Sequence, residues 1–285
     1  MRERPKFTVN LCRAAAMCPR LFWFGWLGGG TLMFEPEETP TMGRVFHEAM
    51  DGMFVLLSQY ERTSGTLPKD DDCCSLAYDK VLAPILERRV AGGHDTGEAL
   101  TGLWTSFQQG VAMFGKYLKG AQDKVATGQL VDTTLLQGEH EVEAASRRTG
   151  GPSLTGRIDA IVFDHNRGVP LILEYKTGAR DWRYADIVQV SLYRWMLKEA
   201  RGVEAEPVLC YFTPHLEEMF FDEEALAAPP FSEPTAILMK MEKWSKWQEG
   251  EEPLPSPSAP GLCRKCPHQK TCPEIFGPLE EVIGE

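Results

Sequence analysis

The spacing of apolar residues changes from a helical period in the first half of the chain to a strand period in the second half. Apolar residues three or four apart predict helices at residues 8–27, 43–61, 74–90 and 96–127. The first of these helices begins with Thr8 as its cap and ends at the glycine run 28–30. We therefore expect the first half of the chain to be helical.

Short apolar runs rich in strand-forming residues follow from residue 130 onward. They predict strands at residues 130–144, 153–163, 170–177, 206–213 and 217–221, with helices at 183–201 and 232–248. The first three strands would form a meander. We expect one α/β domain over residues 1–285, in which helices flank a mixed sheet, with a helical N-terminal elaboration and a C-terminal cysteine loop.

A predicted hairpin gathers polar residues on one face of the strand region. The second strand turns at residues 164–168 into the third. Since successive strand side chains point to opposite faces, Glu174 and Lys176 share a face and Tyr175 points away. Asp159 belongs to the preceding strand, so the hairpin can bring two carboxylates and an ammonium group together.

Two carboxylates beside a lysine are suited to hydrolysis with a divalent cation. The oxygen ligands of Asp159 and Glu174 favour Mg²⁺ or Mn²⁺, and Lys176 could orient a water molecule or stabilise negative charge. Cleavage of a phosphodiester requires these functions together with a stabilised leaving group. The motif indicates a nuclease, with an ordinary surface salt bridge as the alternative.

The charge balance of the chain is acidic. The 30 Lys and Arg residues against 41 Asp and Glu residues give a formal charge of −11, which counts against nucleic-acid binding by the whole surface. A metal site must concentrate carboxylates, so the local distribution of basic residues is more informative. Residues 1–20 carry five Lys or Arg and one Glu, and Lys176, Arg180 and Arg183 form a second basic group, with solvated surface as the alternative for both.

The composition is that of a globular protein, with 43% hydrophobic and 25% charged residues. No apolar run approaches the roughly 18 residues of a membrane-spanning helix. The N-terminus lacks an apolar signal segment. We therefore expect a cytoplasmic protein with no membrane partner.

Eight cysteines in a chain expected in the cytoplasm favour metal ligands over disulfides. Cys263, Cys266 and Cys272 form a triplet in the polar loop 261–275. Three thiolates do not complete a four-ligand site. Cys18 is the expected fourth ligand because proline follows it, as it follows Cys266 and Cys272, so that residue 18 and the loop would clamp the two ends of the chain together.

The spacing of the cysteines does not determine which metal this site would hold. Four thiolates suit either an iron–sulfur cluster or zinc, and the Cys-Pro pairs favour a [4Fe-4S] cluster. His268 could serve a zinc site, and Cys12 could replace Cys18 as a ligand.

Six motifs in order resemble those of the PD-(D/E)xK nucleases. They are Cys18-Pro19, Gly43-x-x-x-His47, Gly156-Arg157-Ile158-Asp159, Glu174-Tyr175-Lys176-Thr177-Gly178, Gln189-x-x-x-Tyr193 and the cysteine triplet. The chain looks most like the RecB-like group, whose CRISPR-associated exonucleases and helicase-nuclease subunits carry a four-cysteine [4Fe-4S] cluster. The resemblance implies a restriction-endonuclease-like sheet, and it is weakest at residues 62–128, where we expect a helical insertion.

The resemblance also implies a role for each matched residue. The ligands of Mg²⁺ or Mn²⁺ would be His47, Asp159, Glu174 and the backbone carbonyl of Tyr175. Lys176 would be the catalytic lysine, and Gln189 and Tyr193, one helical turn apart, would complete the catalytic set on the substrate side. The cluster ligands would be Cys18, Cys263, Cys266 and Cys272. Without the resemblance, His47 and Tyr193 would be interpreted as core residues.

The function that the resemblance implies is a metal-dependent DNA exonuclease acting on single-stranded ends or overhangs. It would act in CRISPR adaptation or in DNA recombination and repair, with a CRISPR integrase or helicase subunits as possible partners. The alternative is a subunit that positions DNA ends in such a complex with little activity alone. A zinc-clamped RNA-processing enzyme is a third hypothesis.

Three other groups of residues are candidates for substrate contact. Glu139, Glu141 and Glu143 alternate on a strand, which favours a solvated face, with one of them lining the site as the alternative. The aromatic run 22–26 favours core packing near the cluster over base stacking. Trp182, between Arg180 and Arg183, is the preferred candidate for contact with a nucleic-acid strand.

Overall fold

The computed structural model describes residues 5–28, 42–91, 97–126, 128–145, 152–177, 183–257 and 260–277. The predictions for Gly178, Arg180 and Trp182 lie outside these residues. The helices are α1 Val9–Met17, α2 Pro19–Leu27, α3 Met42–Ser64, α4 Asp70–Ala77, α5 Ala83–Ala91, α6 Gly97–Ala121, α7 Leu130–Thr134, α8 Arg183–Arg201, α9 Glu223–Ala227, α10 Ala236–Trp244 and α11 Thr271–Phe276. A π-helical turn, Tyr78–Leu82, joins α4 to α5, and a 3-10 turn, Pro260–Lys265, precedes α11.

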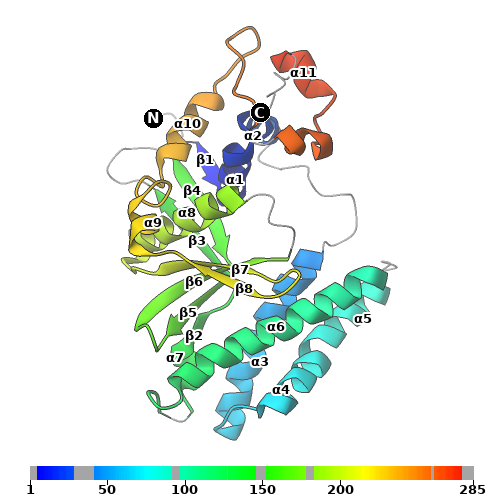
Figure 1. The fold of residues 1–285 in the computed structure, drawn as a ribbon, viewed down its shortest axis with the longest axis vertical. Coiled ribbons are helices and arrows are strands. Elements are labelled where there is room, and N and C mark those ends of the chain that lie inside the picture. The colour runs from blue at the N-terminus through cyan, green and yellow to red at the C-terminus, as the bar shows by residue number, and fades with distance from the viewer. Residues whose placement is uncertain are drawn as a thin grey trace.

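The strands form two sheets with helices on both sides (Figure 1). They are β1 Lys6–Thr8, β2 Leu135–Gln137, β3 His140–Ala145, β4 Ser153–Ile158, β5 Ala160–Asp164, β6 Val169–Lys176, β7 Glu206–Tyr211 and β8 Glu217–Phe220. The larger sheet has the order β2-β5-β6-β7-β8, and the smaller has the order β1-β4-β3. Both sheets mix parallel and antiparallel pairs, which confirms the predicted mixed α/β fold.

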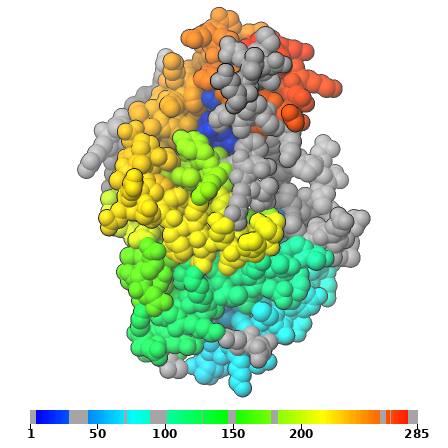
Figure 2. Space-filling view, in the orientation of Figure 1, coloured from blue at the N-terminus to red at the C-terminus, as the bar shows by residue number. Residues whose placement is uncertain are grey.

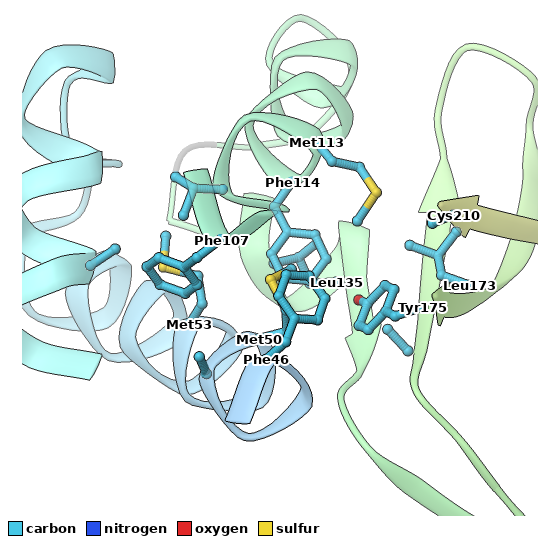
Figure 3. Close-up of a cluster of buried hydrophobic side chains, with 14 of the residues drawn as sticks. Phe46, Met50, Met53, Phe107, Met113, Phe114, Leu135, Leu173, Tyr175 and Cys210 are labelled. Atoms are coloured by element: carbon cyan, nitrogen blue, oxygen red, sulfur yellow. The ribbon is translucent and has the colours of Figure 1, made fainter. Parts of the chain in front are cut away.

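Strand β6 is covered by helices on both of its faces. Leu171, Leu173 and Tyr175 point into a hydrophobic cluster with α3 and α6, whereas Ile172 belongs to the cluster formed with α8. Figure 3 shows the first of these clusters, in which Phe46 and Met50 lie between α6 and the strands. Burial on both faces explains why β6 is an almost continuous apolar run. The polar residues of this strand, Glu174 and Lys176, lie at its C-terminal end.

The two ends of the described chain lie side by side. The rings of Trp23 and Phe24 in α2 contact Phe276 in α11, with ring centroids 5.3 and 5.9 Å apart. Figure 2 shows the blue N-terminal residues beside the orange and red residues of the C-terminal segments. The aromatic run 22–26 therefore serves core packing in this region, as the sequence favoured.

The predicted helix at 8–27 is wrong in one respect, because it is two helices. Pro19 cannot donate a backbone hydrogen bond and disfavours helical geometry at the residue before it. Cys18 accordingly adopts an extended conformation, with φ −159° and ψ 115°, between α1 and α2.

The predicted three-stranded meander is also wrong. Residues 130–134 form helix α7, and the remainder of that predicted strand is divided between β2 and β3 in different sheets. The predicted strand 153–163 is likewise interrupted at Asp159, where β4 of the smaller sheet ends and β5 of the larger sheet begins. The hairpin from β5 to β6 is confirmed, with antiparallel pairing from Ala160↔Leu173 to Asp164↔Val169.

The remaining helix predictions differ mainly at their boundaries. Helix α8 has the predicted bounds, and α3 and α6 lie close to theirs. The predicted helix 74–90 is divided into α4, the π-helical turn and α5, and the predicted helix 232–248 is shortened to α10.

Candidate active site

Asp159 lies at the junction where the chain passes from the smaller sheet to the larger one. Its Oδ2 atom accepts a hydrogen bond of 2.7 Å from the backbone N–H of Tyr175 in the neighbouring strand β6. Its Oδ1 atom lies 2.9 Å from Nδ1 of His47, which α3 supplies. The interruption of the strand thus turns this carboxylate toward both β6 and α3.

His47 and Asp159 form a largely buried ion pair. Burial alone would lower the pKa of His47, but the charge and hydrogen bond of Asp159 raise it to about 9. Burial would raise the pKa of Asp159, but the charge of His47 holds it below its ordinary value. At neutral pH the proton on His47 therefore balances the Asp159 carboxylate.

Glu174 and Lys176 contact each other on one face of β6, as the strand period predicts. Lys176 Nζ donates a hydrogen bond of 2.9 Å to Glu174 Oε1. Gln189 on α8 contacts both residues, since its Oε1 accepts from Lys176 Nζ at 2.8 Å and its Nε2 donates to Glu174 Oε1 at 2.8 Å. Burial, together with the charge of Asp159, raises the pKa of Glu174 to about 7.

Tyr175 points to the opposite face of β6, into the cluster shown in Figure 3. Its ring meets those of Phe46 and His47 edge-on, with ring centroids 5.9 and 5.7 Å apart. This packing fixes the end of β6 against the helix that carries His47.

Tyr193 lies beside Gln189, one turn along α8. Gln189 Nε2 lies 3.3 Å from the Tyr193 hydroxyl, and both side chains are buried. Gly156 of β4 allows this approach, because a Cβ atom there would lie 2.7 Å from Tyr193 Cε1 and 2.6 Å from Val9 Cγ2. The glycine of the Gly156–Asp159 motif therefore leaves room for α1 and Tyr193 at the site.

Sequence reasoning missed Asp186, a buried residue of α8 that contacts the same lysine. Its Oδ1 lies 3.4 Å from Lys176 Nζ and accepts a hydrogen bond of 2.9 Å from Arg13 Nε. Its Oδ2 accepts one of 3.2 Å from the Tyr211 hydroxyl. The signal was present, because Asp186 is one helical turn before Gln189 on the same helix.

A cavity of about 760 Å³ opens beside these residues. Its lining includes His47, Asp159, Glu174, Gln189 and Tyr193. The lining also includes charged residues from the smaller sheet and its edge, which are Lys6, Glu139, Glu141, Glu143 and Arg157. All three glutamates line the cavity and are also exposed to solvent, so the favoured solvated face and the alternative of a place at the site both hold.

One oxygen of the site has the properties expected of a cation ligand. Glu174 Oε2 is buried and accepts no hydrogen bond from any described residue, and it lies beside the buried carboxylate of Asp159. Such an orphaned carboxylate oxygen is costly unless a cation or proton balances it. Within the described ranges, however, no three His, Cys, Asp or Glu side chains are already arranged as a metal-binding group.

The four predicted cluster cysteines gather at the other end of the molecule. Cys18 and Cys266 belong to one apolar cluster with Leu262, although the four thiols are not arranged as a metal-binding group. Burial, and further the neighbouring Cys272 and Cys263, raise the pKa of Cys18 to about 11. Topology thus brings the separated cysteines of the sequence close to one another.

Neither alternative ligand has the same support. Cys12 is fully buried in a different cluster, between α1 and α8. His268 lies next to the cysteines but stacks on Phe24, with ring centroids 4.0 Å apart and planes inclined by 9°.

Beside Cys263, the buried Arg20 has an Nη1 atom without a hydrogen-bond partner among the described residues.

Two solved structures resemble this chain at low sequence identity. No functionally curated protein matches the chain. Among solved structures, SSO0001 is 17% identical with a TM-score of 0.41, covering 96% of this chain and 89% of its own. A candidate exonuclease from Eubacterium rectale is 12% identical with a TM-score of 0.44, covering 93% and 88%.

The family match spans the site from end to end. The family described as the PD-(D/E)XK nuclease superfamily matches residues 6–273, which include both sheets and the three cysteines of the C-terminal loop. Among the described helices, none is long and apolar enough to cross a bilayer. The chain therefore belongs to the PD-(D/E)XK nuclease superfamily.

Proposed function

We propose that this protein is a metal-dependent DNA exonuclease that acts on single-stranded ends or overhangs. The observation that carries the proposal is the buried, unpartnered Glu174 Oε2 beside Asp159 in a cavity that also exposes His47. Family membership supplies the reaction class. The RecB-like motif set supports the finer assignment to strand ends and to CRISPR adaptation or DNA recombination and repair.

The residues that would hold Mg²⁺ or Mn²⁺ are His47, Asp159, Glu174 and the carbonyl of Tyr175. Oxygen ligands suit both ions, and one imidazole is compatible with Mn²⁺ in particular. A bound divalent cation would supply an activated water and neutralise charge on the phosphate and leaving group. His47 must lose one proton before its ring can act as a ligand, because only the neutral imidazole has a free nitrogen lone pair.

We assign to Lys176 the role of acting on the phosphate or on the attacking water, next to Glu174 and Gln189, which line the cavity where Lys176 itself does not. Glu174, Gln189 and Asp186 surround its ammonium group at 2.9, 2.8 and 3.4 Å. Three fixed acceptors hold this cation in one position, and a preorganised cation is what stabilisation of developing negative charge requires. Gln189 also orients Glu174, so one side chain fixes both a ligand and the lysine.

We further propose that Cys18, Cys263, Cys266 and Cys272 hold a [4Fe-4S] cluster that clamps the chain ends structurally. These cysteines come from opposite ends of the sequence and lie near one another, which supports this role. The unpartnered Arg20 Nη1 beside Cys263 is a donor that a cluster sulfur would satisfy. Zinc held by the same cysteines is the alternative.

A second candidate function is a subunit that positions DNA ends for a CRISPR integrase or a helicase. The acidic charge of −11 and the glutamates of the cavity wall favour it, because they weaken unassisted binding of DNA. Cleavage would then require a partner that supplies basic surface.

Activity of the purified chain separates these functions. Anaerobically purified protein should degrade a labelled single strand with Mn²⁺, and Asp159→Ala and Lys176→Ala should abolish cleavage while leaving the brown colour unchanged. Retained activity in both variants would exclude the proposed site. A wild-type chain that binds strand ends but leaves them intact would support the positioning function.

A further inference from the structure

The cavity wall beside the proposed metal site carries both signs of charge. Arg157 on β4 contacts two glutamates, with its Nη1 2.8 Å from Glu139 Oε1 and its Nη2 3.5 Å from Glu141 Oε1. Lys6 on β1 pairs with Glu143 at 3.1 Å. Three glutamates against two cations leave this wall negative, although the substrate expected there is a polyanion.

These ion pairs are open to solvent. The side chain of Arg157 is 55% exposed, and those of Glu139 and Glu141 are 38% and 84% exposed. Water and salt screen such pairs, so they add little to folding stability. Exchanging their carboxylates for another anion therefore costs the fold little.

Arg157 lies close to Asp159 along the chain. It precedes Asp159 by two residues, at the end of β4 where the strand is interrupted, and both residues line the same cavity. A guanidinium presents paired donors that match two oxygens of a phosphate. A phosphate bound there would lie beside the one at the metal site.

We propose that Arg157, assisted by Lys6, forms a subsite for a flanking phosphate of the nucleic-acid strand. Glu139, Glu141 and Glu143 are its counter-ions in the free protein, and the incoming phosphate displaces them. The negative wall thus disfavours a strand whose phosphate does not reach Arg157 and Lys6. This inference rests on the proposed function, since it names how the same site holds its substrate.

The subsite predicts opposite effects of charge removal on the two sides of the ion pairs. Arg157→Gln should weaken binding of a single strand about tenfold, whereas the double variant Glu139→Gln, Glu141→Gln should strengthen this binding several-fold. Each phosphate contact contributes about 0.7 to the slope of log affinity against log salt for single strands. Arg157→Gln should therefore reduce that slope by about 0.7, and Arg157→Lys should restore it.

The experiment is a titration of a short fluorescein-labelled oligothymidylate by fluorescence anisotropy. The full chain is used in EDTA, where no cleavage occurs, at several salt concentrations. Arg62→Gln is the matched control, because Arg62 forms an exposed ion pair with Asp132 and does not line the cavity. Its affinity and salt slope should equal those of the wild type.

Two results would overturn the subsite. One is an Arg157→Gln salt slope equal to that of Arg62→Gln, and the other is weaker binding by the double glutamine variant. Cleavage is a separate measurement, so a chain that binds through Arg157 and does not cut would contradict only the proposed function. A chain that cuts, and whose affinity for the oligothymidylate does not change in Arg157→Gln, would contradict only the subsite.

Discussion

The Nδ1 atom of His47 lies 2.9 Å from the Oδ1 atom of Asp159, which joins helix α3 to the junction of β4 and β5. Both groups in this contact are ligands of the divalent cation in the proposed function. The pair therefore connects metal binding, protonation and folding stability, and each of these can be measured.

The free energy of unfolding of the metal-free protein should fall as the pH rises from about 6.5 to about 9. The Asp159 charge, acting against burial, raises the pKa of His47 from 6.5 to about 9 in the folded state. The folded state thus holds the proton more tightly than the unfolded chain. This stabilisation is complete below pH 6.5 and is lost as the pH rises through about 9.

Denaturant unfolding in EDTA at a series of pH values measures this effect. Glu174, with a pKa raised by burial from 4.5 to about 7, acts in the same direction at lower pH. His47→Gln should flatten the curve between pH 6.5 and 9 and leave the Glu174 portion. A wild-type curve that rises across the His47 range would contradict the ion pair.

Gln189→Ala should lower kcat/KM by roughly 10–100-fold, through metal affinity, turnover or both, as for other residues that orient a ligand. The amide holds Glu174 and Lys176 together, with contacts of 2.8 Å to each. Cleavage rates at increasing Mn²⁺ separate the two contributions. Gln59→Ala, at an exposed position of α3, is the control and should behave as the wild type. Equal rates for the two variants would remove Gln189 from the site.

Gly156→Ala should destabilise the protein by about 1–3 kcal/mol, because the added methyl group is overpacked. It would lie 2.6 Å from Val9 and 2.7 Å from Tyr193, both of which line the cavity. Gly115→Ala in α6 is the matched control, since nothing lies within 4 Å of its added Cβ. Helix propensity predicts a gain there of up to about 1 kcal/mol. Chemical unfolding should show opposite signs, and a shared sign would argue against the close approach.

Asp186→Ala should destabilise the fold by about 1–3 kcal/mol, because Arg13 and Tyr211 lose their buried acceptor. Lys176 also loses one of its three acceptors, so cleavage should slow. Asp132→Ala removes an exposed carboxylate paired with Arg62 and should cost less than about 1 kcal/mol. Thermal unfolding and cleavage rates are the measurements, and an Asp186 variant that matches the Asp132 control would contradict this role.

Cys266→Ala should give a colourless and poorly folded protein if the four cysteines hold a structural cluster. Cys12→Ala should retain the visible absorbance, because Cys12 is buried in the cluster of α1 and α8. Absorbance spectra and iron content after anaerobic purification distinguish these outcomes. A well-folded, colourless and fully active Cys266 variant would argue against the clamp, and zinc in place of iron would support the alternative metal.

Local pattern predicted only part of the set of residues that meet at the site. The two-residue period placed Glu174 and Lys176 together and Tyr175 apart. The family resemblance singled out His47, Gln189 and Tyr193, and the four-residue spacing then placed Gln189 beside Tyr193. These relationships depend only on the geometry of one strand or one helix. The roles of the residues in catalysis remain predictions.

Features that depend on distant residues were missed. Residues 130–134 form a helix because Glu61 of α3 accepts hydrogen bonds from the backbone N–H groups of Leu130 and Val131, at 2.9 and 2.8 Å. No signal near residue 130 shows that acceptor. The Cys18-Pro19 break, by contrast, was visible in the sequence, since proline restricts the residue before it.

The interruption of the strand at Asp159 has a mechanical consequence. The residues before it pair within the smaller sheet, whereas those after it pair within the larger sheet, which contains Glu174. Asp159 is the joint between the two sheets, and its hydrogen bond with Tyr175 ties this joint to the strand that carries Glu174. A bound cation that bridges Asp159 and Glu174 would add a second link between the two sheets and make their connection stiffer.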